Sequence, residues 1–254
     1  MLLKWQCAPT IGTALRLGQL QSRRTITKVA PAANNPQSGL TGAKNIKSDV
    51  ASLSDQVRLL MRRVPYPVAI ITATEPNGPA DKAFRGMTVS SFNTVTLSPE
   101  PVISFNVRRP SETLSALQSS KRFLVHLLAP RQATATLARD FSKGNHNLSL
   151  LEGKSDYEFV AHEHTLRDNE APGRPLPLLR RKQDATSTGL EDFPFVLECQ
   201  LHPQSIQVQD HTIVVGTVVR ALSGELLSLD SETKAADLCL TYANTHFWEM
   251  GHEI

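Results

Sequence analysis

Small hydroxyl side chains are concentrated in one strand-like run, RGMTVSSFNTVTLSPEPVISF, between Arg85 and Phe105. Side chains of this size allow a flat ligand to approach the main chain, whose N–H and C=O groups can then bond to the ligand's edges. A half-exposed strand whose hydroxyls face water would have the same composition, so composition leaves both interpretations open. The side chains in question are Thr88, Ser90, Ser91, Asn93, Thr94 and Thr96.

A single strand over residues 86–97 would divide these side chains between two faces, because alternate residues of a strand point to opposite sides. One face would carry Thr88, Ser90 and Phe92, and the other Val89, Ser91 and Asn93. Gly86, at the start of the run, indicates a bend or a close approach of another group to the backbone.

The segment RRPSETL, residues 108–114, combines two arginines with the predicted start of a helix. Ser111 would cap the helix, and Thr113 would lie in its first turn. Free N–H groups, hydroxyls and a guanidinium together suit a phosphate, although capping alone also accounts for Ser111. Only one strand separates this segment from the hydroxyl-rich run, so a ring-binding site and a phosphate site could be neighbours.

Four histidines stand at positions that could carry chemistry. His211, in QDHTIVVGTV, stands at the entrance to an apolar strand, where it could be a turn residue or contact a substrate. His126, inside the apolar run FLVHLL, is typical of a hydrogen-bonded core residue. The pair His162 and His164 lies in a poorly patterned region and indicates solvated surface rather than a metal site.

Common nucleotide-binding, hydrolase and metal motifs are absent from the sequence. It contains no GxGxxG, GxxxxGK[ST], HExxH or GxSxG. The three cysteines, Cys7, Cys199 and Cys239, form neither a CxxC pair nor a tight cluster, which argues against a disulfide scaffold and a zinc site. No metal site is therefore predicted.

The elements that would position these residues are mostly short strands. About seven or eight strands with short turns and two or three helices predict a mainly β fold, a closed or nearly closed antiparallel barrel. Helices are expected at 52–64, 111–120 and 130–144, and strands at 68–74, 86–97, 102–107, 122–128, 195–203, 205–209, 211–222 and 238–250. Residues 145–190 are polar and weakly patterned, which indicates an insertion, a lid or a surface loop.

The first 48 residues differ from the rest, because they contain no Asp or Glu. A basic, hydroxyl-bearing, acid-free start with apolar residues is typical of a mitochondrial presequence, with RRTI (residues 23–26) as a cleavage region; a disordered basic tail is the alternative. Residues 1–24 hold four of the 27 basic residues and none of the 24 acidic ones, so the remainder has 23 basic residues and net charge −1. That balance gives no sign of a nucleic-acid-binding face, and no apolar run is long enough to span a bilayer.

Three ordered segments, GMTVSSFNTVTLSPEPVISFNV, SETLSALQSSKRFLVHLL and DHTIVVGTVV, resemble the flavin reductase-like family. The similarity covers about residues 60–143 and 195–247. It implies an FMN-binding split β-barrel with a few flanking helices, spanning residues 49–254 here. It also implies a homodimer with FMN, or sometimes FAD, near the subunit interface. The implied activity is reduction of the flavin by NADH or NADPH, with an oxygenase or another electron acceptor as a further partner.

Carried over by position, the resemblance assigns roles to individual residues. His211 would lie near the nicotinamide and is the one catalytic candidate, and His126 stands where the family often has Asn. The isoalloxazine ring would be lined by Met87, Thr88, Val89, Ser90 and Ser91. The ribityl phosphate would be bordered by Asn106, Val107, Ser111 and Thr113.

Two functions are compatible with this sequence. The first is an NAD(P)H:FMN oxidoreductase of the mitochondrial matrix, in which the flavin carries out the hydride chemistry and the protein supplies binding and orientation. The second is a non-enzymatic FMN-binding carrier or assembly protein, with residues 145–190 as an interaction surface. A barrel that has lost the flavin is a third, since fold alone does not decide function.

Overall fold

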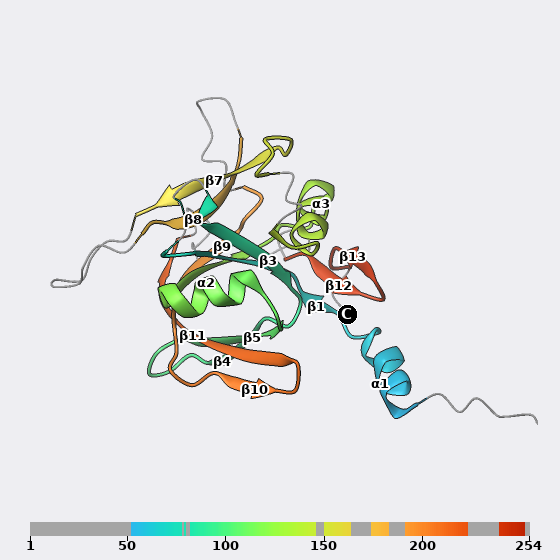
Figure 1. The fold of residues 1–254 in the computed structure, drawn as a ribbon. Coiled ribbons are helices and arrows are strands. Elements are labelled where there is room, and N and C mark those ends of the chain that lie inside the picture. Colours follow the sequence, from blue (N-terminus) through green and yellow to red (C-terminus); the bar gives the residue numbers. More distant parts are fainter. Residues whose placement is uncertain are drawn as a thin grey trace, which may run out of the picture. The chain divides into compact units, whose positions relative to one another are not determined.

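The computed structural model describes residues 52–77, 79, 82–145, 150–163, 174–182, 191–222 and 239–251 (Figure 1). All of these lie in the compact unit Val50–Ile254. The predicted presequence and the linker after it, residues 1–48, lie outside the described residues. Within the described part of the chain, no helix has the length and apolar character needed to cross a membrane.

Short strands make up most of the described fold. The helices are α1 (Leu53–Met61), α2 (Glu112–Ser120) and α3 (Gln132–Phe141). The strands are β1 (Tyr66–Pro67), β2 (Ala69–Thr74), β3 (Phe84–Val89), β4 (Asn93–Thr96), β5 (Val102–Arg108), β6 (Arg122–Leu127), β7 (Tyr157–His162), β8 (Leu176–Arg181), β9 (Phe195–Leu201), β10 (Ile206–Val208), β11 (His211–Ala221), β12 (Thr241–Ala243) and β13 (His246–Trp248).

One antiparallel sheet forms the body of the molecule. Its strand order is β3-β2-β6-β9-β11-β5-β4, with β10 added beside β11. The sheet curls into a half-barrel, so the edge strand β3 comes back toward β5 without pairing with it (Figure 1). The predicted mainly β split barrel is confirmed, and its open seam lies beside β3.

Two apolar cores lie on opposite faces of this sheet. Alternate residues of β2 serve both: Ile71 packs inside with Phe105 and Leu117 of α2, whereas Ile70 packs outside with Leu137 of α3 and Leu179 of β8. Every residue of β2 is buried as a result, which explains why its sequence AIITAT is apolar without alternation.

The 145–190 region contains more structure than expected. Its described part includes the antiparallel hairpin β7–β8, which contributes the buried residues Tyr157 and Leu179 to the outer core. Thr72 Oγ1 donates to Pro177 O at 2.7 Å, and Thr74 Oγ1 donates to Pro175 O at 2.6 Å. The interpretation as a polar surface loop is therefore wrong for this part, because strand pairing and buried contacts hold it on the sheet.

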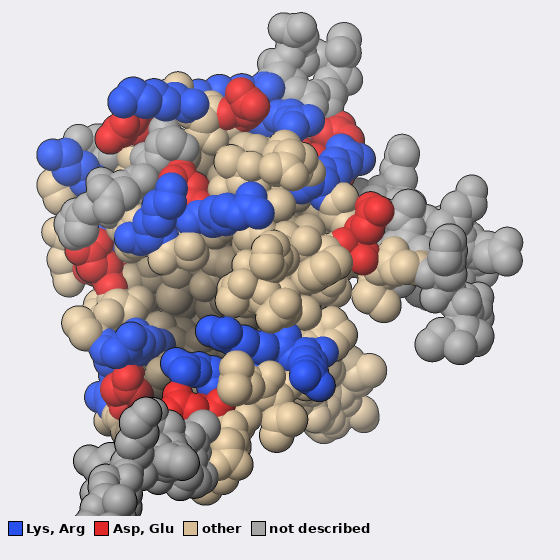
Figure 2. All heavy atoms as spheres, turned by 90° about the vertical axis from the view of Figure 1, so that its right-hand side faces the viewer, with Lys and Arg blue, Asp and Glu red and all other residues tan. Residues whose placement is uncertain are grey.

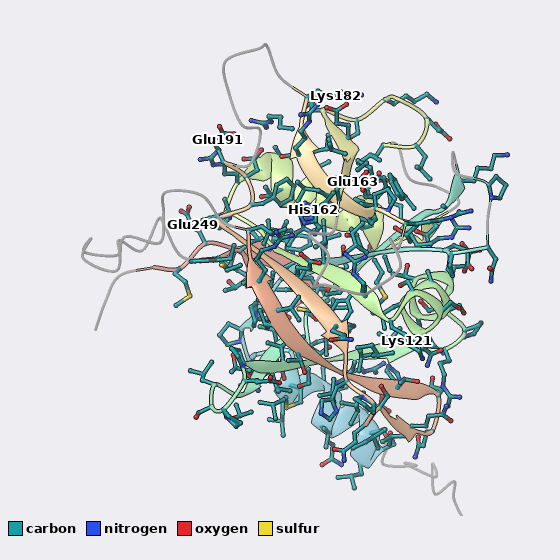
Figure 3. All side chains as sticks on the ribbon, turned by 90° about the vertical axis from the view of Figure 1, so that its left-hand side faces the viewer. Lys121, His162, Glu163, Lys182, Glu191 and Glu249 are labelled. Atoms are coloured by element: carbon teal, nitrogen blue, oxygen red, sulfur yellow. The ribbon has the colours of Figure 1, made fainter. Side chains whose placement is uncertain are left out.

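A buried carboxylate also fixes the hairpin to the barrel. Glu198 of β9 is 2% exposed and accepts from Arg122 at 3.0 Å and Arg220 at 2.7 Å. Arg220 Nη2 also donates to His162 Nε2 at 2.9 Å, and Figure 3 shows His162 at the end of β7. His162 is thus occupied in an ion-pair network, and no group of residues suited to a metal occurs in the described ranges.

The hydroxyl-rich run does not form one strand. β3 ends at Val89, residues 90–92 form an irregular link, and β4 begins at Asn93. The expected alternation of faces from Thr88 to Asn93 is therefore wrong, because the chain must leave one side of the seam and join β5 on the other. β4 is exposed along its whole length.

Two glycines allow close contacts with aromatic rings, one on each face of the sheet. A Cβ at Gly86 would lie 2.3 Å from the Phe141 ring, and one at Gly216 would lie 2.5 Å from the Phe123 ring. No side chain larger than hydrogen fits at these separations. Of the two predictions for Gly86, a bend or a close approach, the close approach is confirmed.

Candidate functional site

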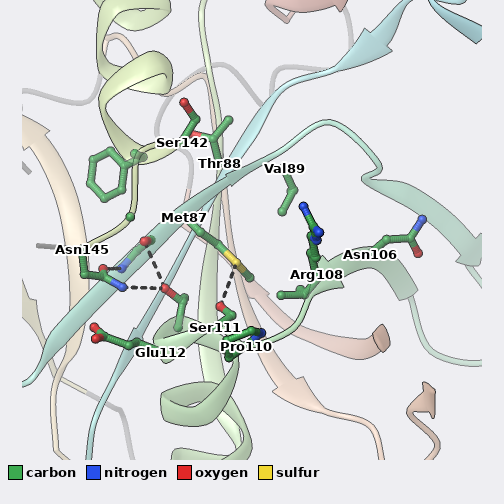
Figure 4. Close-up of a pocket in the computed structure, with 15 residues that line it drawn as sticks. Met87, Thr88, Val89, Asn106, Arg108, Pro110, Ser111, Glu112, Ser142 and Asn145 are labelled. Atoms are coloured by element: carbon green, nitrogen blue, oxygen red, sulfur yellow. Dashed lines mark hydrogen bonds between the residues drawn. The ribbon is translucent and has the colours of Figure 1, made fainter. Parts of the chain in front are cut away.

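A cavity of about 370 Å³ opens along the free edge of β3 (Figure 4). Its volume falls within the range of about 300–1,000 Å³ typical of small-molecule sites. Three elements meet around it: the edge of β3, the segment from the end of β5 to the start of α2, and the end of α3 with its following turn. The lining residues are Gly86, Met87, Thr88, Val89, Asn106, Val107, Arg108, Pro110, Ser111, Glu112, Thr113, Phe141, Ser142, Gly144 and Asn145.

Side chains tie down the backbone of Gly86 at this edge. β3 pairs only with β2, and the Gly86 amide and carbonyl are bonded by side chains instead. The Gly86 N–H donates to Asn145 Oδ1 at 2.8 Å, and Thr113 Oγ1 donates to Gly86 O at 3.0 Å. Asn145 Nδ2 donates in turn to Thr113 Oγ1 at 3.2 Å. This triad joins β3, α2 and the turn after α3 into one wall of the cavity.

The start of α2 gives the cavity an anion-binding character. Ser111 is the N-cap, and its Oγ accepts from the Leu114 N–H at 3.2 Å. Other N–H groups of the first turn and the guanidinium of Arg108 border the same space. Glu112 also lines the cavity, but its carboxylate is paired with Arg85 at 3.3 Å. The arrangement suits a phosphate or carboxylate group.

Comparison with known proteins identifies the family. The model of the flavin reductase like domain matches residues 61–250. The chain belongs to the flavin reductase-like family. An NADH:FMN oxidoreductase of Rhodococcus erythropolis is 29% identical over 181 residues, 71% of this chain and 74% of the relative. The FMN reductase (NADH) SmoA of Agrobacterium fabrum is 29% identical over 154 residues, 61% of this chain and 68% of the relative.

Solved structures share the fold of this flavin reductase-like chain. The flavin reductase HpaC complexed with NADP+ aligns with a TM-score of 0.51 at 23% identity, over 78% of this chain and 98% of HpaC. The NADH:FAD oxidoreductase SgcE6 of Streptomyces globisporus, in complex with NAD and FAD fragments, aligns with a TM-score of 0.50 at 23% identity, over 78% and 93% of the two chains. At these identities the likeness establishes the architecture.

The cavity has the features needed for flavin mononucleotide, the flavin in the names of both relatives. The unpaired outer edge of β3 offers main-chain groups to a flat ring, and small or flexible side chains (Met87, Thr88) leave room above it. The start of α2, with Ser111 and Arg108, offers donors to a phosphate at the other end. A ring-binding edge and an anion-binding helix start within one cavity match the two halves of FMN.

The structure brings together most of the residues predicted for the site. Seven of them line the cavity: Met87, Thr88, Val89, Asn106, Val107, Ser111 and Thr113. Four do not line it: Ser90, Ser91, His126 and His211. Thr88 is also fixed from outside, because its hydroxyl donates to Ala138 O of α3 at 2.7 Å.

Ser90 and Ser91 occupy the irregular link after β3. Ser91 Oγ accepts from the Asn106 N–H at 2.8 Å, so its hydroxyl bridges the open seam between the link and β5. Ser90 faces away from the first cavity and lines two neighbouring ones. Ser91 therefore has a structural role, whereas Ser90 lines the two neighbouring cavities.

The His126 side chain is buried away from the cavity and is hydrogen-bonded at both ring nitrogens. Strand alternation points it to the outer core, where Leu179 N donates to its Nε2 at 3.1 Å and its Nδ1–H donates to Ile70 O at 3.2 Å. Both ring nitrogens are therefore used by the backbone. Complete burial lowers the pKa of His126 to about 3, partly opposed by the bond to Ile70. The structure does not bring His126 to the flavin cavity, and it fixes β8 to the sheet instead.

His211 lies at the cavity's edge rather than in its wall. It pairs in register with Arg108, which does line the cavity. Its Nδ1 lies 2.7 Å from Asp210 Oδ1, and both side chains are about half exposed. The hydrogen bond from His211 holds the pKa of the Asp210 carboxyl below its usual range, with a further contribution from Arg108.

Sequence reasoning missed the wall supplied by the end of α3. Phe141, Ser142, Gly144 and Asn145 line the cavity, although ARDFSKGN was interpreted only as a helix ending at glycine. The one available signal was Gly144 followed by Asn145, a pair suited to a left-handed turn; Gly144 has φ 92°. Nothing in the sequence indicated that this turn returns to Gly86, some sixty residues earlier.

Proposed function

We propose that this protein is an NAD(P)H-dependent FMN oxidoreductase. The observation that carries the proposal is the cavity in which the free edge of β3 meets the start of α2 and Arg108. Family membership and relatives named NADH:FMN oxidoreductase and FMN reductase (NADH) support the same activity. FMN is the expected flavin, NADH or NADPH the co-substrate, and FAD the alternative flavin.

The residues of this chain would bind and orient the flavin. Main-chain groups along β3 would bond to the edge of the ring, and Ser111 with Arg108 and the first turn of α2 would hold the phosphate. When bound, the flavin supplies the hydride-accepting chemistry. His211, held by Asp210 beside Arg108, is proposed to contact the nicotinamide from the end of β11. Phe141 and Val107 would exclude water from the inner side of the cavity.

We further propose a homodimer. Large apolar side chains are exposed on β4 and its end, where Val95 is 58% and Leu97 74% exposed. On α1, Leu53 is 75% and Leu60 64% exposed, and no residue of the helix is buried. Exposed apolar surface on two elements is typical of an interaction face, and a second copy of this chain is the proposed partner.

Localisation in the mitochondrial matrix and transfer of reduced flavin to an oxygenase or another acceptor are proposed as well. The acid-free N-terminal 48 residues support the first. The styrene monooxygenase flavin reductase of Pseudomonas putida, which shares the fold, supports the second by analogy. A fluorescent fusion to residues 1–48 that fails to enter mitochondria would remove the first proposal.

A visible spectrum with nucleotide addition tests the activity. The purified full-length chain, supplied with FMN and freed of excess, should show the absorbance of oxidised flavin. Anaerobic NADH or NADPH should then bleach it. Retained FMN that neither nucleotide reduces would favour the non-enzymatic FMN carrier. A chain that binds no FMN would refute both functions and leave a barrel without flavin.

A further inference from the structure

A second cavity of about 440 Å³ adjoins the flavin cavity. The two share Thr88 and Ser142, so they are parts of one groove along β3. The second part lies between α3 and the C-terminal hairpin β12–β13, and its lining consists of Val68, Thr88, Ser90, Ala138, Arg139, Ser142, Tyr242, Thr245 and Phe247. A third part, of about 370 Å³, continues past Ser90 and Tyr242 to α1. The groove is therefore longer than one mononucleotide needs.

Arg139 is the charged residue of the second cavity. Its guanidinium lies over the Phe247 ring, with Cζ 4.9 Å from the ring centroid. Stacking on a ring orients the guanidinium plane and leaves its N–H groups free at the edge. Among the described residues no carboxylate pairs with Arg139, whereas Arg131 of the same helix is paired with Asp192 at 2.9 Å. An oriented, uncompensated guanidinium suits a phosphate.

The walls beside Arg139 carry aromatic rings and further positive charge. Tyr242 and Phe247 meet edge to face with centroids 5.3 Å apart. Arg62 lines the third cavity together with Arg58, which is paired with Asp55 at 2.6 Å, and none of the described residues that line the second or the third cavity is acidic. Figure 2 shows the side of the molecule that carries α1, α3 and β12–β13, where Lys and Arg side chains border a hollow. Rings together with cations match a nucleotide rather than an apolar ligand.

We infer that Arg139, stacked on Phe247, binds a phosphate of the nicotinamide dinucleotide. The inference rests on the proposed function, because it takes the first cavity to hold FMN. The start of α2 already provides one phosphate site there, so a second anion site farther along the groove serves a second nucleotide. The shared residues Thr88 and Ser142 mark where that nucleotide would meet the flavin. Arg139 is thus a binding and specificity-determining residue for the hydride donor.

Binding measurements with the oxidised dinucleotides test this without turnover. FMN is titrated first into the full-length chain by flavin fluorescence, and NADP+ and NAD+ are then titrated into the FMN-loaded protein by calorimetry. Arg139→Gln should weaken dinucleotide binding about tenfold, the effect of one lost charge-assisted contact, and should leave the FMN Kd unchanged. Arg139→Lys, which keeps the charge but loses the planar fork, should fall between. Arg63→Gln is the matched control, since Arg63 is exposed and lines none of the three cavities.

Three outcomes of these titrations would overturn the inference. Dinucleotide binding equal in Arg139→Gln and the parent chain would show that Arg139 makes no such contact. A loss of FMN or FAD affinity with intact dinucleotide binding would assign Arg139 to the flavin instead. A parent chain that binds FMN but neither NADP+ nor NAD+ would overturn it as well. If the parent chain binds no FMN, the proposed function fails separately, and titration of NADP+ into the flavin-free variants still decides the role of Arg139.

Discussion

Replacing Asn145 by Ala should loosen the wall of the flavin cavity and weaken FMN binding. The side chain accepts from the Gly86 N–H at 2.8 Å and donates to Thr113 at 3.2 Å. Each neutral hydrogen bond contributes about 1 kcal/mol net. Asn145 is half-buried beside an open cavity, so water can replace part of what is lost. The expected decrease in the free energy of unfolding is about 1–2 kcal/mol.

The effect on FMN follows from the same bonds. In Asn145→Ala the turn after α3 is no longer held against β3, and ligand binding must order it. If ordering this turn makes the binding free energy of FMN about 1 kcal/mol less favourable, the FMN Kd rises roughly fivefold. Fluorescence quenching of FMN gives the Kd, and urea unfolding followed by circular dichroism gives the stability. Asn145→Asp keeps an acceptor for Gly86 and should lose less of both.

Asn77→Ala, on the exposed turn after β2, is the control for a general effect of removing a surface amide. It should leave both quantities unchanged. Asn145→Ala could instead unfold at the same urea concentration as the parent chain and bind FMN with the same Kd. In that case the triad of Gly86, Asn145 and Thr113 does not maintain the cavity. Lost stability with unchanged FMN affinity would make the triad structural and separate it from the flavin site.

Three other perturbations test other parts of the reasoning. Ser111→Ala should destabilise by about 1 kcal/mol through loss of the N-cap and should weaken FMN but not riboflavin in parallel titrations; equal losses would place the phosphate elsewhere. Gly216→Ala should cost about 1–3 kcal/mol by overpacking against Phe123, and parental thermal stability would contradict the close contact. The folded pKa of His126 is about 3, below its unfolded value of 6.5. Because the core accommodates only the neutral imidazole, stability is highest above pH 6.5, and about 1 kcal/mol of it is lost as the pH falls from 6.5 to 5.5. His126→Asn should flatten that part of the pH dependence of urea unfolding, and an unchanged slope would refute it.

The sheet could be predicted because its signals are local. Runs such as VISFNV and HTIVVGTVV show β-branched residues and turn residues at their ends, and these became β5 and β11. The start of α2 at Ser111 was equally visible, since a cap depends on the residues beside it. A close approach at Gly86 was one of two predictions for that residue, although the Phe141 ring that approaches it could not be named from the sequence.

The misplaced expectations all depended on contacts between distant segments. The resemblance places His126 at the flavin, but strand alternation and the docking of β8 turn it to the opposite face. The prediction of a hydrogen-bonded core histidine, made from the run FLVHLL, is confirmed. The hairpin β7–β8 was not foreseen because its partners are the buried Glu198 and Thr72, which lie in other parts of the sequence. Asn145 was overlooked for the same reason.

The open seam explains why hydroxyl side chains gather where they do. A closed barrel would pair the outer edge of β3 with another strand, and small polar side chains there would have no special use. Here Asn145 and Thr113 cover Gly86, and Ser91 bridges to Asn106 of β5. Side chains thus replace a missing strand at two points and leave the stretch around Thr88 between them open to the cavity. Within the hydroxyl-rich run, Ser91 holds the link to β5, Thr94 and Thr96 of β4 face water, and Thr88 borders the space for a flat ligand.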